Sequence, residues 1–125
     1  GAYADDEDCA NCGAVHILFL KADGTLKADE KINSGGGLTT TLFNNDYFGH
    51  GVASAGDYDA DGVPDLLVGA PSTGDGGSNV GALYVLLLNT DGTVKAEAKL
   101  SKTTSVRCIW LTHIFRRQNI GLTHR

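Results

Sequence analysis

The residue types that this sequence lacks already narrow its class. It has two prolines, one tryptophan and no methionine, against seventeen glycines among 125 residues. Its longest apolar run, residues 81–88 (GALYVLLL), has the length of a strand and is too short to span a bilayer. Outside the C-terminal end, no stretch shows sustained helical periodicity with caps. Frequent turns and short apolar runs together predict an all-β protein.

A leader is also missing from the start of the sequence. The first residues carry no basic segment followed by an apolar core, and the chain does not begin with methionine. We expect a fragment or a processed piece of a longer protein, so the missing leader says little about its compartment.

Basic residues are scarce in most of the chain. Residues 1–101 contain five lysines and no arginine against fifteen acids, a net charge of −10, whereas residues 102–125 contain five basic residues and no acid. An acidic body of this kind argues against nucleic acid as the main partner and suits a protein that meets cations.

Cysteine is too sparse for a zinc site. Cys9 and Cys12 form a C-x-x-C pair, but no second pair exists, and Cys108 stands alone. A redox motif would open a helix after a strand, and the neighbouring residues do not suggest a helix. We expect a loop disulfide or two incidental thiols.

Signatures of catalysis are absent as well. The sequence has no nucleophile elbow and no glycine-rich loop followed by the lysine and helix that cradle phosphate. Its four histidines are scattered, at positions 16, 50, 113 and 124. We expect no enzyme, no catalytic residues and no organic cofactor.

What the chain does contain is an internal repeat. Residues 13–32 align with residues 81–100 at an offset of 68 without a gap, with ten identities in twenty positions. Repetition at a fixed period is typical of propellers and solenoids. Strands are expected at residues 48–55, 65–70, 82–88 and 93–100, and Asp91-Gly92 predicts a hairpin because both residues tolerate positive φ. The expected fold is an open part of a β-propeller built from blades of four antiparallel strands; the alternative is a sandwich of two sheets.

An acidic loop lies between the first two strands of the repeat. Numbered from Asp57, carboxylates stand at positions 1, 3, 5 and 9, a glycine at position 6 and a backbone carbonyl is available at position 7. This is the oxygen-ligand pattern of a calcium loop, and it explains why four carboxylates that repel one another are placed together. Magnesium suits it less, because that ion demands octahedral geometry and keeps its waters. The candidate ligands are Asp57, Asp59, Asp61, the Val63 carbonyl and Asp65.

Residues 47–74, YFGHGVASAGDYDADGVPDLLVGAPSTG, resemble the FG-GAP repeat. This repeat is the blade unit of integrin α-subunit propellers and of many secreted microbial proteins. Phe48-Gly49 matches the first motif, Gly69-Ala70-Pro71 matches the second, and the calcium loop lies between them. The resemblance implies a calcium-stabilised, extracellular or cell-surface module used in adhesion or ligand binding, with the same five residues as calcium ligands.

The expected organisation has three parts. Residues 1–32 are interpreted as the second half of a preceding FG-GAP blade, residues 33–101 as an FG-GAP repeat with its calcium loop, and residues 102–125 as an atypical basic tail that is non-native or disordered. The chain thus holds about one and a half repeats, fewer than the four to eight blades of closed propellers. An amphipathic, membrane-seeking helix is the alternative for the tail, but membrane contact by the module is not expected.

Three functions remain open. The first is a structural or adhesion module that binds calcium and, through the parent propeller, a protein or glycan ligand. The second is a carbohydrate-binding propeller, for which Tyr3, Tyr47 and Tyr58 are the aromatic candidates, although no aromatic cluster is visible in the sequence. The third is a non-catalytic propeller attached to a secreted hydrolase or lyase. Fold alone does not choose among them.

Overall fold

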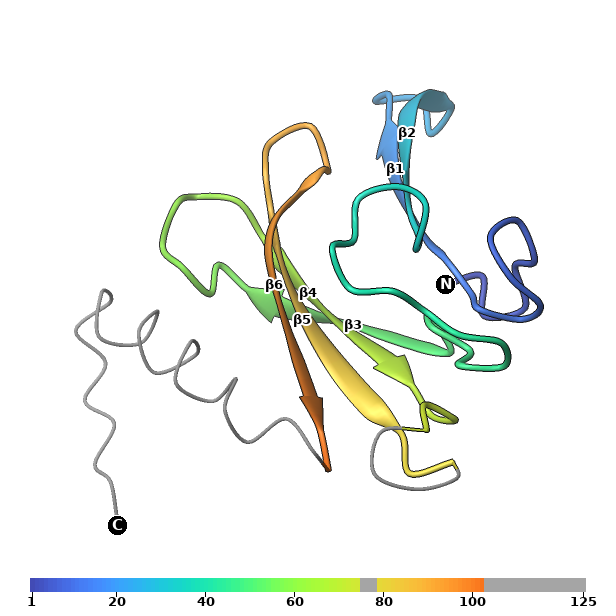
Figure 1. The fold of residues 1–125 in the computed structure, drawn as a ribbon. Coiled ribbons are helices and arrows are strands. Elements are labelled where there is room, and N and C mark those ends of the chain that lie inside the picture. Colours follow the sequence, from blue (N-terminus) through green and yellow to red (C-terminus); the bar gives the residue numbers. More distant parts are fainter. Residues whose placement is uncertain (75–78, 103–125) are drawn as a thin grey trace, which may run out of the picture.

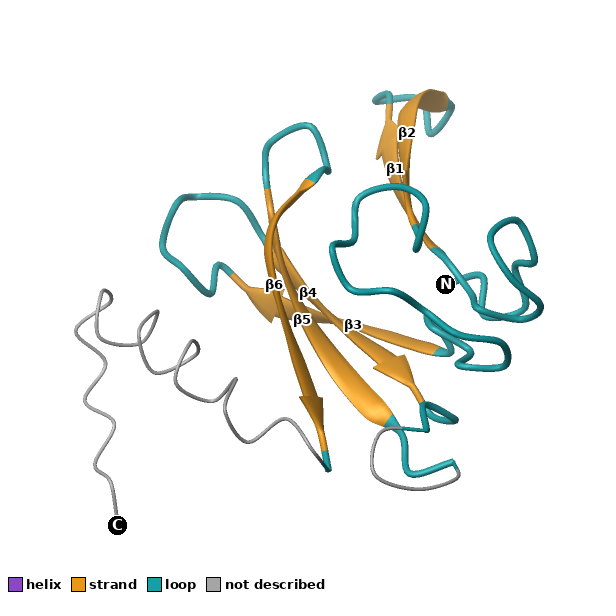
Figure 2. Cartoon of the chain, in the orientation of Figure 1, coloured by secondary structure: helices purple, strands orange, loops and turns teal. Residues whose placement is uncertain are grey.

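The computed structural model describes residues 1–74 and 79–102, and these residues form strands and loops without a helix (Figures 1 and 2). Residues 103–125 of the expected basic tail, Cys108 among them, lie outside the described residues. Six strands are present: β1 (Val15–Leu20), β2 (Leu26–Ile32), β3 (Gly51–Gly56), β4 (Asp65–Ala70), β5 (Ala82–Leu88) and β6 (Val94–Ser101). In this part of the chain no helix is long and apolar enough to cross a membrane.

The strands make two antiparallel sheets. Strands β1 and β2 form a hairpin, and β3, β4, β5 and β6 form a four-stranded sheet in sequence order. Neither sheet closes into a barrel, and the hairpin lies beside the larger sheet (Figure 1). The all-β prediction is therefore confirmed, and the arrangement is that of an open, partial propeller.

One strand begins later than expected. The sequence predicted a strand from Phe48, whereas β3 begins at Gly51. The chain turns sharply at Gly49, whose φ is 88°, and a Cβ there would lie 2.4 Å from the carbonyl oxygen of Ala14. Only glycine allows the two backbones to approach so closely. The Phe-Gly pair is thus a junction between the two repeats and not part of a strand.

The hairpin turns also differ in detail from the expected turn. Gly92 has a φ of 84°, but Asp91 does not adopt a left-handed conformation. The Asp91 carboxylate instead accepts the backbone N–H of Thr93 at 3.0 Å and its hydroxyl at 2.6 Å. The N–H of Asn89 donates to the Thr93 carbonyl at 2.8 Å and closes the loop. Asp-Gly marks the hairpin correctly, but the aspartate acts through its side chain.

The internal repeat is exact at the level of hydrogen-bond register. The partners Val15 and Ile32 in the hairpin recur as Leu83 and Leu100 in the sheet. The bridge that pairs Ala2 with Ala14 recurs, at the same offset of 68, as a pair at the end of β4 and the start of β5. Both hairpins also have a shift of the pairing register at the same place, immediately before their last pair of residues. Residues 1–32 therefore adopt the structure of the second half of a four-stranded unit.

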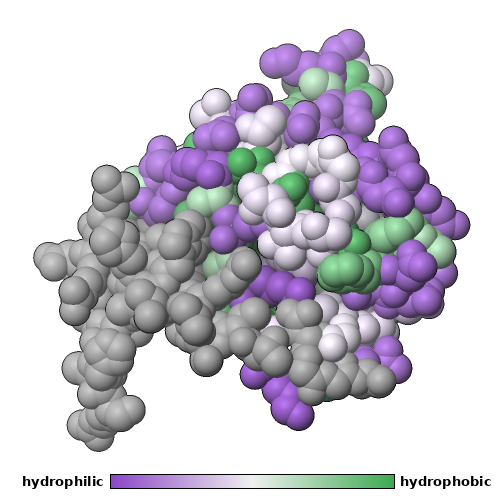
Figure 3. Space-filling view, in the orientation of Figure 1, coloured by the Kyte–Doolittle hydropathy of each residue, from purple (hydrophilic) through white to green (hydrophobic). Residues whose placement is uncertain are grey.

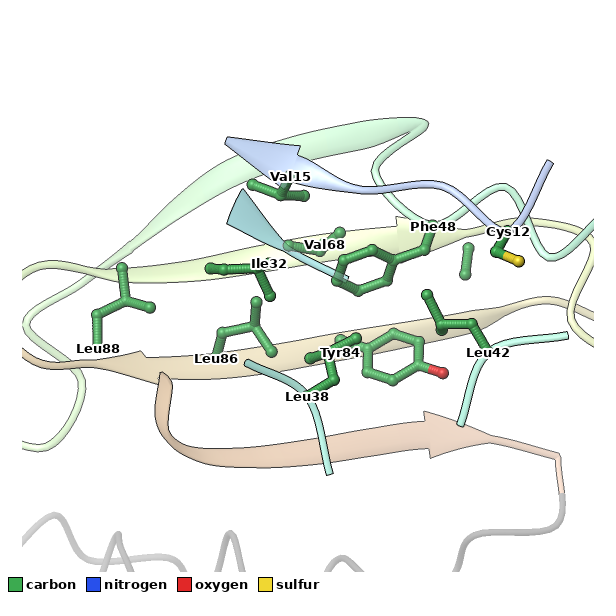
Figure 4. Close-up of a cluster of buried hydrophobic side chains, with 11 residues drawn as sticks. Cys12, Val15, Ile32, Leu38, Leu42, Phe48, Val68, Tyr84, Leu86 and Leu88 are labelled. Carbon is green, nitrogen blue, oxygen red and sulfur yellow. The ribbon is translucent and has the colours of Figure 1, made fainter. Parts of the chain in front are cut away.

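The main core lies between the hairpin and one face of the four-stranded sheet (Figure 4). At its centre the rings of Phe48 and Tyr84 meet edge to face, with centroids 5.0 Å apart and both side chains fully buried. The rest of this cluster comes from both repeats and from the loop between them: Cys12, Val15, Ile32, Leu38, Leu42, Val68, Ala70, Leu86 and Leu88. Each repeat thus completes the core of the other.

The segment that joins the two repeats is held in place by β6. One carboxylate oxygen of Glu97 accepts the backbone N–H and the hydroxyl of both Thr39 and Thr40, at 2.6–3.1 Å. At the N-terminal end, Cys9 and Cys12 form a disulfide with Cα atoms 5.4 Å apart, and the Cys12 side chain enters the core. Of the two alternatives for this pair, the structure has the loop disulfide.

The outer face of the β1–β2 hairpin is exposed. Leu18, Leu20 and Leu26 are 57%, 60% and 52% exposed, although their counterparts in the four-stranded sheet are buried or half-buried beneath the hairpin. In the view of Figure 3, hydrophobic residues form separate patches among hydrophilic ones. The same repeat position is therefore core in one copy and surface in the other.

This difference allows a matched test of the core. Leu86→Ala should lower the free energy of unfolding by about 2–5 kcal/mol, because Leu86 is fully buried, and Leu18→Ala, at the equivalent position, by less than about 0.5 kcal/mol. Urea denaturation of both variants gives the two values. Equal losses would mean that the hairpin does not pack on the sheet as described.

Candidate metal centre

The loop between β3 and β4 is shaped by its own carboxylates. Both oxygens of Asp57 accept backbone N–H groups, from Asp61 at 3.0 Å and from Gly62 at 2.8 Å. Asp61 in turn accepts the N–H of Val63 at 2.8 Å. Gly62 has a φ of 87°, which a residue with a side chain would adopt only under strain. These bonds fold residues 57–63 back on themselves.

Folding the loop in this way gathers three carboxylates. Asp57, Asp59 and Asp61 each place an oxygen within 4.8 Å of the others. In residues 1–74 and 79–102 this is the one group of three or more potential metal-ligating side chains. The structure thus brings together three of the five predicted ligands, and all of their donors are oxygens, which hard divalent cations prefer. Their role as ligands stays a prediction.

Asp65, the fourth predicted acid, has a different position. Its side chain is fully buried, and it accepts the backbone N–H of Tyr58 at 2.8 Å and that of Leu88 at 2.9 Å. Burial raises the pKa of this carboxyl group, and the charges of Asp59 and Asp61 raise it further, against the two N–H groups that lower it. Asp65 is outside the group of three and connects the loop to β5. Its role as a ligand, like that of the Val63 carbonyl, stays a prediction.

Lys95 on β6 also lies at this site, although no sequence pattern pointed to it. Its ammonium group pairs with the carboxylates of both Asp59 and Asp61. The hydrogen bond from Lys95 is the largest cause that lowers the pKa of Asp61, to about 2, and the two carboxylates raise the pKa of Lys95. Lys95 follows β5 and is far from the β3–β4 loop in sequence. Only the pairing of strands brings its side chain to the loop.

The contact with Lys95 leaves one carboxylate oxygen of Asp59 without a partner. Asp59 Oδ1 is buried and has no hydrogen-bond partner, which is costly for a carboxylate. A cation already lies against two of the three carboxylates, in the form of the lysine ammonium. An oxygen-only donor set with one buried, unpartnered oxygen fits a divalent cation such as calcium.

A second acidic loop, residues 5–8, differs from the first. Lys31 on β2 pairs with Asp5 and Glu7 there, and Asp8 accepts the backbone N–H of Gly35 at 2.9 Å. The hydrogen bond from Lys31 is the main cause that lowers the pKa of Asp5. These carboxylates are used by a lysine and by backbone groups and do not converge on one point.

The fold and the loop together define a repeat of four antiparallel strands with an acidic loop between the first and second strands. Residues 48–86 match the family model of the FG-GAP repeat. This span runs from Phe48, through the acidic loop and the Gly-Ala-Pro motif, into β5. Residues 48–86 are therefore similar to an FG-GAP repeat, and residues 1–32 repeat the structure of the second half of this unit. No solved structure matches the chain significantly.

The pairing of Asp61 with Lys95 predicts a pH dependence. A carboxylate with a folded-state pKa of about 2, below the usual 3.8, stabilises the fold above pH 3.8 and loses this contribution as the pH falls through about 2. In metal-free buffer, Asp61→Asn should therefore melt at a lower temperature than the parent at pH 7, and the difference should vanish between about pH 4 and pH 2. Melting curves that stay separated by a constant amount down to pH 2 would contradict the pairing.

Proposed function

We propose that this chain is a calcium-binding FG-GAP repeat module of a secreted or cell-surface protein, with a structural role in adhesion or ligand binding. The observation that supports it best is the convergence of Asp57, Asp59 and Asp61 in the loop of a matched FG-GAP repeat. The module is not an enzyme in this proposal, and the ligand of the parent protein is a protein or a glycan.

The loop residues would act on a bound calcium ion in two ways. The three clustered carboxylates would bind it, together with Asp65 and the Val63 carbonyl, and the bound charge would neutralise their repulsion. Asp65 is fully buried and accepts the backbone N–H of Leu88, so it connects the loop to the end of β5. Calcium would thereby stabilise the first hairpin of the sheet against the third strand. Extracellular calcium modules bind with a Kd of about 10⁻⁴–10⁻³ M, which is useful where calcium is millimolar.

Asp59→Asn is the sharpest test of this site. Asp59 accepts no backbone N–H in the described structure, so its replacement should leave the loop folded while it removes one ligand charge. We expect calorimetric titration to show one calcium ion bound to the parent, with a rise in melting temperature, and binding weakened by about tenfold or more in the variant.

Asp29→Asn provides the control. It removes the same charge from an exposed carboxylate on β2, outside the metal cluster, and should bind calcium like the parent. A parent chain that melts at the same temperature in millimolar calcium and in EDTA would exclude the proposed site.

A second candidate function has one supporting observation. The rings of Tyr3 and Tyr47 lie 6.1 Å apart, and Tyr3 lies 5.0 Å from the ring of His50, with Tyr3 itself 49% exposed. The structure thus forms the aromatic cluster that the sequence did not reveal, whereas Tyr58 is half-buried elsewhere, where burial raises the pKa of its hydroxyl. Exposed aromatic rings of this kind can stack on sugar rings.

A glycan array tests this candidate directly. If the cluster binds sugars, Tyr3→Ala should abolish array binding, and Phe43→Ala, which removes another exposed aromatic ring, should not. Absence of binding by the parent would leave the structural role alone. The third function, support of a secreted hydrolase or lyase, depends on other parts of a longer protein and has no observation of its own here.

A further inference from the structure

The position of Lys95 is set by a β-bulge. Leu87 pairs with Ala96 and Leu88 pairs with Val94, so Lys95 is the extra residue between two ladder pairs. A bulge redirects the side chain of the extra residue and increases the local twist. Here the ammonium group of the bulged residue lies against Asp59 and Asp61 of the loop between β3 and β4. Figure 1 shows that loop in green beside the start of β6 in orange.

The first repeat contains the same bulge and the same residue. Phe19 pairs with Ala28 and Leu20 pairs with Leu26, which leaves Lys27 as the extra residue at the position equivalent to Lys95. The position equivalent to the β3–β4 loop falls before residue 1 of the sequence, and the acidic loop at residues 5–8 pairs with Lys31. Among the described residues, Lys27 makes no ion pair. In both repeats, therefore, a lysine is the extra residue of the bulge, and it forms ion pairs where an acidic loop lies beside it.

The contacts of Lys95 are made with two of the three carboxylates that would bind a metal ion. Its ammonium group holds one oxygen of Asp59 and one of Asp61, so a divalent cation bound to the same two carboxylates would lie beside a like charge. Binding of the ion therefore favours displacement of the lysine. The ion pairs stabilise the loop in the absence of metal and oppose metal binding.

We propose that Lys95 is an intrinsic competitor of the metal ion, and that it sets the affinity of the loop for divalent cations. This inference depends on the proposed calcium function. Two partly exposed ion pairs together change an equilibrium constant by about 2- to 30-fold, so Lys95 weakens calcium binding by a factor in this range. The lysine also keeps the loop folded when calcium is absent.

The test is calcium titration of the whole chain and of Lys95→Met, with Lys27→Met as the matched control. Lys95→Met keeps a long side chain at the bulge and removes the charge; the control makes the same change where no carboxylate is paired. We expect calcium to bind Lys95→Met about 2- to 30-fold more tightly than it binds the parent, and Lys27→Met with unchanged affinity. Lys95→Arg, which keeps the charge, should bind like the parent.

Thermal melts provide a second readout that does not depend on affinity. In metal-free buffer, Lys95→Met should melt below the parent, because the carboxylates lose their counter-charge. In saturating calcium the two melting temperatures should converge, because the lysine is displaced in the parent as well.

The outcomes separate this inference from the function on which it depends. Calcium binding by the parent with equal or weaker binding by Lys95→Met overturns the role of Lys95 and leaves the calcium site intact. Binding by both, with Lys95→Met the tighter, supports the competition. Binding by neither overturns the proposed function and this inference with it.

Discussion

The packing of two repeats against each other is the constraint on which the described structure depends. A β-sheet with an apolar face needs a second layer, and one repeat unit alone cannot provide it. Phe48 and Tyr84 meet edge to face in the centre of this contact, with residues from the β1–β2 hairpin, the connecting loop and the four-stranded sheet around them (Figure 4). Gly49 makes the contact possible, since its backbone lies against that of Ala14. The Phe-Gly motif therefore serves the junction between repeats.

The acidic loop is connected to this core through one buried carboxylate. Asp65 accepts an N–H group from the loop, at Tyr58, and another from the end of β5, at Leu88. The other three acids lie at the surface of the loop, where their charges are partly screened and partly balanced by Lys95. One set of four aspartates thus divides into a buried anchor and a partly exposed, electronegative cluster. This division separates the carboxylate that connects the loop to the core from the three that lie close enough together to hold a metal ion.

Much of the fold follows from patterns within single segments. The offset of 68, the apolar runs and the Asp-Gly turns predicted the four strands of the sheet and the preceding hairpin, because strand formation depends on local alternation and turn chemistry. The predicted start of β3 was wrong by three residues, because the chain turns at Gly49, where its backbone lies against that of the neighbouring repeat. The turn at Asp91 differed because a side-chain hydrogen bond to Thr93 replaced the expected backbone conformation.

The sequence by itself determined the repeat, because two segments at an offset of 68 share the same pattern. It also determined the all-β class and the grouping of Asp57, Asp59 and Asp61, because these depend on residues close together in the chain. Only the tertiary structure decided the different position of Asp65, the aromatic group of Tyr3, Tyr47 and His50, and the contact of Lys95 with the acidic loop. These features join segments that are far apart in sequence, and strand pairing and the bulge at Lys95 bring them together. The sequence of a single segment does not predict which side chain from a distant strand will lie beside it in the folded sheet.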